Sequence, residues 1–314
     1  MNDANSSGMG SNLFGSPLAK DPTVALPAVR LQSPTAPGPV RKIQFVIEIV
    51  GPRTVPAPTV QAILQLHWQQ ALGHPQAFVM AGSDQNWRPL TPNDGSGAYD
   101  SLALAWDLIT PIGDLTAPVA QKLWDAAEDF AKQVGRRAIA IPIPQDVPHN
   151  AGVLRQLRES LDIGFNLTVT PASRPLEEKE IWRVAAALGL DYSTNGSFVW
   201  KAEGSELPLF EVFPGGEAER FLLSQVQAGA QHPCIGLGFS VPLCPDPMTA
   251  IDGCLKAGLV FADRLRALLL DEDDRPVNDQ SKVKLAKNLE QAVGALNRAG
   301  IAPGSIEALK LFAV

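Results

Sequence analysis

Residues 233–242, PCIGLGFSVP, form the stretch that decides the fold. Large apolar side chains alternate with small ones along it, which is the two-residue period of a β-strand. One face of this strand would carry Ile235, Leu237, Phe239 and Val241, and the other would carry Gly236, Gly238 and Ser240. The sequence therefore predicts a sheet with one apolar face and an opposite face almost free of large side chains.

Two helices are expected after this strand. A stripe of apolar residues near 3.6-residue spacing predicts a long helix that covers the apolar face: Ile251, Leu255, Leu259, Ala262 and Leu269. The polar run Asp271–Asp274 and Pro276 separate it from a second helix, which we expect to end at Gly300 because glycine suits the left-handed cap position. We expect the tail, residues 300–312, to belong to the same folded unit.

Length and composition limit the function classes. A chain of 314 residues is expected to form about two domains. Its 33 acidic and 26 basic residues give a net charge of -7, which argues against a general nucleic-acid binder, since phosphate neutralisation needs clustered Lys and Arg. The three cysteines, Cys234, Cys244 and Cys254, match no metal motif and predict free thiols in a reducing cytoplasm.

Hydrophobic periodicity divides the chain into three parts. Residues 1–40 are rich in Ser, Gly and Pro and predict a disordered arm. Residues 41–163 predict a first α+β unit, with strands near 43–50, 76–81, 100–109 and 136–144, a helix over 55–72 and a helix that Asp114 caps and Gly135 ends. Residues 164–314 predict a second unit, with strands near 165–171, 197–203 and 208–213 and a helix closed by Gly189.

The two predicted units share an order of elements, although no residue-level repeat is visible. Both are expected to be antiparallel sheets covered by helices on one face, a layered α+β architecture of the ferredoxin-like kind.

Motifs that carry catalytic chemistry do not occur in the sequence. The chain lacks the H-E-x-x-H, Walker, G-x-S-x-G and C-x-x-C patterns. The pair Gly236 and Gly238 lies inside an alternating strand, which is better explained by a strand face kept clear of side chains than by a dinucleotide site. We therefore expect no enzymatic activity, no metal site and no cofactor.

Several segments together resemble a known family. They are Leu209, Phe210 and Val212, then PCIGLGFSVP, then LLDEDDRPV at 269–277 and GIAPGSIEALKLF at 300–312. This series resembles the ZipA cell-division family over about residues 165–312, and the first half fits more loosely as a degenerate unit of the same kind. The resemblance implies a split β-α-β fold whose uncovered sheet face binds the C-terminal peptide of the tubulin-like protein FtsZ, supporting assembly of the division ring.

Two features depart from the family pattern. Family members begin with a transmembrane helix and a long linker, whereas this chain begins with a polar arm, so membrane contact is expected to be indirect or through a missing anchor. No segment of this chain approaches the ~20 apolar residues that a bilayer span needs, and we expect a cytoplasmic protein, localised at the division site or at the inner-membrane face. The family's well-studied branch also lines its groove with large apolar side chains, where this chain has Gly236 and Gly238.

The candidate peptide site follows from the resemblance and the strand pattern. Its proposed members are Gly236 and Gly238 for close approach, Phe198 and Trp200 for apolar contact, and Thr168 and Ser240 for hydrogen bonding. This assignment requires Phe198 and Trp200 to point outward. The alternatives are that Trp200 is a core residue, or that the bare sheet faces of the two units pack together. We expect Gly238→Phe to abolish peptide binding without unfolding the domain.

A second function class stays open. A ferredoxin-like regulatory or small-molecule-binding protein, with its ligand between the two halves, would fit the same elements.

Overall fold

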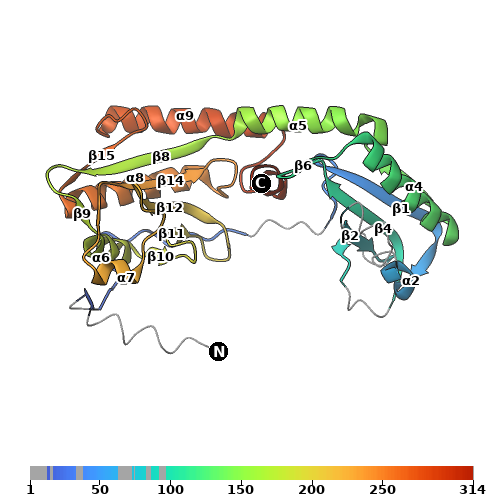
Figure 1. The fold of residues 1–314 in the computed structure, drawn as a ribbon, viewed down its shortest axis with the longest axis horizontal. Helices are drawn as coiled ribbons and strands as arrows, with labels where there is room; N and C mark the ends of the chain where they lie inside the picture. The colour runs from blue at the N-terminus through green and yellow to red at the C-terminus, as the bar shows by residue number, and fades with distance from the viewer. Residues whose placement is uncertain are drawn as a thin grey trace. The chain divides into compact units, whose positions relative to one another are not determined.

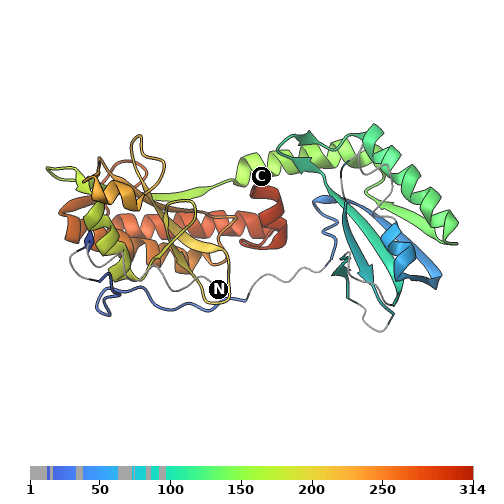
Figure 2. The same ribbon diagram turned by 60° about the horizontal axis from the view of Figure 1, so that its bottom comes forward.

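The computed structural model describes residues 13–14, 17–32, 38–62, 73, 75–82, 86–91 and 97–313. The chain forms two compact units, shown in Figures 1 and 2. Unit 1 comprises Met1–Ser33 with Leu161–Ser305, and unit 2 comprises Pro34–Ser160 with Ile306–Val314. These bounds differ from the two consecutive units that the sequence predicts, because the N-terminal segment joins unit 1 and the C-terminal tail joins unit 2.

Unit 1 contains a six-stranded sheet in the order β10-β11-β12-β14-β8-β15, with antiparallel pairing throughout. The alternating segment within residues 233–242 forms the inner strand β14, as predicted. The strands of this sheet are β8 (Gly164–Pro171), β10 (Asp191–Tyr192), β11 (Phe198–Lys201), β12 (Pro208–Pro214), β14 (Ile235–Ser240) and β15 (Ala267–Leu270). A separate two-stranded ribbon pairs β9 (Leu176–Glu177) with β13 (Gln231–His232).

The helices of unit 1 are α6 (Glu178–Leu188), α7 (Leu223–Gln227), α8 (Pro247–Leu265) and α9 (Asp279–Arg298). Helix α8 packs on β8, β12, β14 and β15. Left-handed glycines follow α6 and α9 as predicted, Gly189 with φ 77° and Gly300 with φ 69°. The predicted long helix ends earlier than expected, since Arg266 takes a left-handed conformation (φ 53°) and Leu269 pairs with Val169 in the sheet.

The N-terminal segment of the described chain lies along unit 1. The Asp21 N–H donates to the Ala187 carbonyl (2.9 Å), and the Glu203 N–H donates to the Val29 carbonyl (2.7 Å). Phe14 is only 1% exposed. The predicted disorder of residues 1–40 is therefore wrong for residues 17–32. Composition alone gives no interaction that would offset the entropy lost when this segment is ordered, but its backbone hydrogen bonds to a folded unit do offset that loss.

Unit 2 contains a five-stranded sheet in the order β3-β2-β4-β1-β7. Its strands are β1 (Gln44–Pro56), β2 (Gln76–Met80), β3 (Arg88–Pro89), β4 (Ala98–Asp107) and β7 (Arg137–Ile141), with a small ribbon of β5 (Ile109–Thr110) and β6 (Gly113–Asp114). Its helices are α2 (Ala57–Ala62), α4 (Ala117–Gln133), the short η2 (Pro144–Asp146), α5 (Val147–Leu161) and the C-terminal α10 (Ile306–Phe312).

Two details of unit 2 differ from the sequence-based expectations. Thr116, not Asp114, is the residue before α4, and Asp114 instead forms an ion pair with Arg155. Gly135 follows α4 with φ 69°, as predicted. The predicted helix over 55–72 begins two residues later than expected, as α2, because Val55 and Pro56 belong to β1; residues 63–72 lie outside the described residues.

The two sheets share a strand order. The sequence of neighbours is β2-β4-β1-β7 in unit 2 and β12-β14-β8-β15 in unit 1. In both units one helix, α4 or α8, connects an inner strand to an edge strand. The shared element order that the sequence suggests is therefore present in space.

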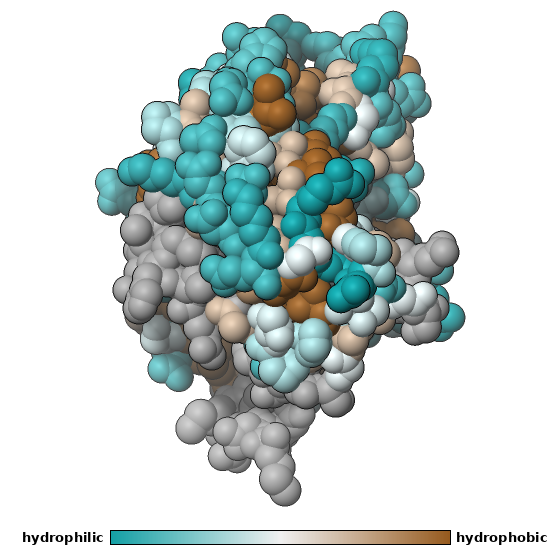
Figure 3. Space-filling model, turned by 90° about the vertical axis from the view of Figure 1, so that its right-hand side faces the viewer, coloured by the Kyte–Doolittle hydropathy of each residue, from teal (hydrophilic) through white to brown (hydrophobic). Residues whose placement is uncertain are grey.

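Figure 3 shows hydrophobic side chains as a narrow band between larger areas of hydrophilic ones. None of the helices in the described part of the chain combines the length and the apolar composition that a bilayer-spanning segment needs.

Candidate functional site

Strand pairing in unit 1 fixes which side chains share a face of the sheet. Trp200 faces α8, since a Cβ added at Gly253 of that helix would lie 2.2 Å from the Trp200 ring. Side chains in the opposite phase form what we call the outer face. Its members are Asn166, Thr168, Thr170, Val199, Glu211, Phe213, Gly236, Gly238, Ser240, Leu268 and Leu270.

An aromatic ring lies over the glycine track of the outer face. Phe213 pairs with Gly236, and a Cβ on Gly236 would lie 2.2 Å from Cε2 of Phe213. The ring therefore fills the space that a larger residue at position 236 would occupy. Phe213 is nevertheless 38% exposed, and Leu268 on the edge strand β15 is 52% exposed. Two apolar side chains are thus available on this face.

Gly238 has a different role from Gly236. A Cβ at this position would lie 2.3 Å from Oδ1 of Asn166 and 2.5 Å from the backbone oxygen of Phe165. Because a backbone atom is involved, Gly238→Phe would strain the sheet. These distances argue against the expectation that this substitution refills the face at no cost to the fold, and Gly238 allows β14 to pack closely against β8.

The two aromatic residues predicted for the site lie on the other side of the sheet. Phe198 is 3% exposed and Trp200 is 5% exposed. The Phe198 ring packs against Trp182 of α6, with a centroid distance of 4.9 Å. The outward orientation considered for this pair is wrong, and the core alternative holds. The physical reason is register: Phe198 pairs with Val212 and Trp200 with Phe210, which share the core phase of β12.

The predicted hydrogen-bonding residues are partly suited to their role. Thr168 is half-buried on the outer face, where it lies between Gly236 and Leu270 in the pairing. The Ser240 hydroxyl is buried and has no hydrogen-bond partner among the described residues. Of this pair, Thr168 has the more central position on the face.

Phe213 is the functional candidate that the sequence reasoning missed. The signal was available, because Glu211 is the charged residue of the predicted strand 208–213 and residues two apart on a strand share a face. Phe213 follows Glu211 by that spacing, so the same alternation predicts an outward ring.

Two carboxylates give the outer face an acidic border. Oε2 of Glu211 accepts a hydrogen bond from the Ser197 hydroxyl (3.3 Å). Oε1 of Glu272 accepts from the Asn166 backbone N–H (3.2 Å). The arrangement offers an apolar ring, polar groups of moderate size and negative charge, which suits non-covalent binding of a peptide with apolar and basic side chains.

Two other sites with potentially reactive side chains, the His232–Glu178 pair and Cys244, have structural roles. His232 and Glu178 form a buried pair (3.2 Å), and Glu178 also accepts from the Leu222 N–H (2.8 Å) and from the Trp182 indole (3.3 Å). Their polar atoms are thereby satisfied inside the unit. Burial raises the pKa of the Cys244 thiol to about 12, so it is not a reactive thiolate near neutral pH.

Comparison with known proteins is consistent with this geometry. No curated protein sequence shows a significant match to the chain. Residues 163–288 match the family described as ZipA, C-terminal FtsZ-binding domain. The matched segment runs from the start of β8 into α9 and includes every residue of the outer face. Residues 163–288 of unit 1 are therefore similar to the ZipA C-terminal domain.

Proposed function

We propose that the protein is a non-enzymatic cell-division adaptor that binds the C-terminal peptide of FtsZ on the outer face of unit 1. The family description names FtsZ as the partner of this domain. The observation that carries the proposed location is Phe213, whose ring lies over Gly236 and remains 38% exposed. Binding to FtsZ would bring the protein to the division site.

The apolar part of the proposed interface is small and centred on Phe213. A bound segment would cover the Phe213 ring, with Leu268 and Leu270 on the far side of Thr168. Aromatic residues at the centre of an interface commonly carry most of the binding energy, while their neighbours exclude water. We therefore assign Phe213 as the anchor of the site in place of Phe198 and Trp200.

The acidic border supports a preference among peptides. Glu211 and Glu272 lie on either side of Asn166 and Gly238, close to the outer face. A basic side chain next to the apolar residues of the peptide would gain a favourable electrostatic contact there. Raising the salt concentration should weaken binding if this contact contributes.

The test is a titration of the full chain with a fluorescently labelled FtsZ C-terminal peptide, followed by anisotropy. Saturable binding is expected, and Phe213→Ala should weaken it by about tenfold or more, as expected for a central aromatic anchor. Leu259→Ala is the matched control, because Leu259 is similarly exposed (41%) but lies on helix α8. The control variant should bind like the unmodified chain.

Two results would contradict the proposal. A flat titration with a folded chain would mean that the domain is present without this partner, and would favour the ligand-binding alternative. Equal weakening by Phe213→Ala and Leu259→Ala would reject the outer face as the site while retaining FtsZ as the partner.

A further inference from the structure

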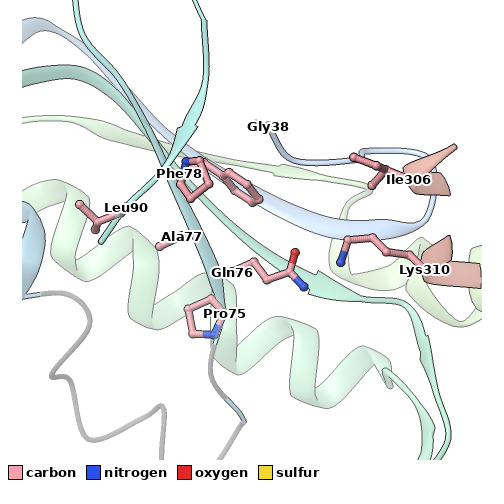
Figure 4. Close-up of a pocket in the computed structure, with 9 residues that line it drawn as sticks. Gly38, Pro75, Gln76, Ala77, Phe78, Leu90, Ile306 and Lys310 are labelled. Carbon is pink, nitrogen blue, oxygen red and sulfur yellow. The ribbon is translucent and has the colours of Figure 1, made fainter. Parts of the chain in front are cut away.

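The C-terminal helix α10 is part of unit 2, although the chain before it belongs to unit 1. The Lys310 ammonium lies 3.1 Å from Oδ1 of Asp107 at the end of β4. Ile306, one helical turn earlier, lines a cavity of about 410 Å³ together with Phe78 of β2. Figure 4 shows both α10 side chains directed toward this part of the sheet.

The contacts place α10 beside one face of the unit 2 sheet, at the end of β4. Asp107 is in the same strand phase as Ala103 and Ala105, which pair with Phe78 and Val46. We call this surface the α10 face. Its members are Gln44, Val46, Gln76, Phe78, Ala103, Ala105 and Asp107.

The α10 face corresponds to the outer face of unit 1. Strand β4 occupies the same place in its sheet as β14, and it also alternates large and small residues. Ala103 and Ala105 are the small residues of β4, as Gly236 and Gly238 are those of β14. The same face of the fold therefore carries the small side chains in both units, and in unit 2 Trp87 packs on them while α10 lies beside the face, near Phe78 and Asp107.

The charged residues of α10 lie next to residues of opposite charge in unit 2, which favours one orientation of the helix. Lys310, in its last turn, pairs with Asp107. Glu307, in its first turn, lines a second cavity of about 470 Å³ with Arg41, Lys42 and Trp87. The acidic end of the helix thus lies near basic residues and the basic end near an acidic one.

The size of α10 and its fit indicate a docked segment. The helix has 7 residues, whereas isolated helices shorter than about 12–15 residues are marginal in water. Its helical conformation therefore depends on the surface against which it packs. The cavity of about 410 Å³ beside Ile306 and Lys310 is lined mainly by apolar residues, among them Pro75, Pro89 and Leu90. A helix inserted into an apolar groove is a recurrent mode of peptide recognition.

We propose that the α10 face is a docking site for a short amphipathic helix, and that α10 is its ligand within the same chain and can be exchanged for the same segment supplied in trans. The proposal concerns unit 2 and is independent of FtsZ binding by unit 1. Release of α10 uncovers a second peptide-binding surface on the protein, with an acidic contact at Asp107 and an apolar contact at Phe78.

The first experiment uses a chain that ends after Ser305 and a labelled peptide of residues 303–314. The peptide should bind this shortened chain saturably, while the intact chain, whose site is filled, should bind it much more weakly. Asp107→Arg in the shortened chain should reduce the affinity by about tenfold, because like charges would then face each other. A peptide carrying Lys310→Glu should recover part of that loss.

Asp125→Arg is the control for the charge change, since Asp125 is exposed on α4 and contacts Gln121 of the same helix. It should leave peptide binding unchanged. A folded shortened chain that binds no peptide would overturn the proposal, as would Asp107→Arg binding as well as the unmodified sequence.

A second variant covers the case in which the shortened chain does not fold. A specific protease site inserted between Ala302 and Pro303 allows the intact protein to fold before the linker is cut. After cutting, α10 should stay bound and then exchange with labelled peptide added in excess. A cut segment that never exchanges, or that leaves and does not rebind, would show that α10 is not an exchangeable ligand.

Discussion

The two sheets of this protein have corresponding strand orders but different surfaces on corresponding faces. In unit 1 the outer face carries glycines and one exposed aromatic ring, Phe213. In unit 2 the corresponding face carries Ala103 and Ala105, which are fully buried, with Trp87 packed against their cluster and α10 nearby. The same face of this fold is therefore covered by a side chain of the protein itself in unit 2, where Trp87 packs on it, and stays partly exposed in unit 1.

The two terminal segments also contact different kinds of surface on the two units. Residues 17–32 bind unit 1 through Ala187 and Leu188 at the end of α6 and through Glu203 after β11, none of which belongs to the outer face. Helix α10 binds unit 2 through Asp107 on the α10 face. Both segments contact a folded unit, but only α10 contacts a residue on this face of a sheet, Asp107.

The largest expected effect is a difference in the free energy of unfolding between a variant of the covered face and a variant of the open face. Trp87→Ala removes a ring that packs on Val46, Phe78, Ala103 and Ala105, and should lower the free energy of unfolding by about 2–4 kcal/mol. Phe213→Ala removes an exposed ring and should cost less than about 1 kcal/mol. Urea unfolding of both variants measures the difference, and equal losses would contradict the distinction between a covered and an open face.

A smaller effect is expected from the glycine at the centre of unit 1. Gly238→Ala should lower the free energy of unfolding by about 1–3 kcal/mol, because the new methyl group would meet the Phe165 carbonyl. Gly152→Ala is the control: it lies in α5, where an added Cβ would meet no atom within 4 Å outside its own helix backbone, and it should stabilise the chain by about 0.5–1 kcal/mol. A neutral Gly238→Ala would mean that β14 and β8 can separate slightly at low cost.

The smallest effect concerns the anchoring of the N-terminal segment to unit 1. Hydrogen bonds from the Thr23 hydroxyl and from Arg264 lower the pKa of Asp21 to about 2. Because the folded-state pKa lies below the ordinary value, this contribution to stability is present above about pH 4 and is lost as the pH falls toward 2. An NMR titration of the Asp21 carboxyl should give a midpoint near 2, whereas a midpoint near the ordinary value of 3.8 would mean that the segment is not held there.

The candidate site was only partly predictable from the sequence. Alternation identified β14 and its small-residue face, and it contained the information needed to find Phe213. It could not orient Phe198 and Trp200, because a short strand with large residues at successive positions fits either phase. Pairing with Val212 and Phe210 decided the orientation. The six predicted site residues therefore separate into four on the outer face and two in the core.

Local patterns determined the α+β class, the central strand and the glycine positions after α4, α6 and α9, because each depends on neighbours within a few residues of the chain. Tertiary structure alone decided where the chain ends belong. The segment 17–32 is interrupted by Pro17, Pro22 and Pro27, and the tail 306–314 is short, so neither specifies its own fold. Each is ordered by hydrogen bonds, ion pairs and apolar contacts to residues more than a hundred positions away, such as Asp21 with Arg264 and Lys310 with Asp107.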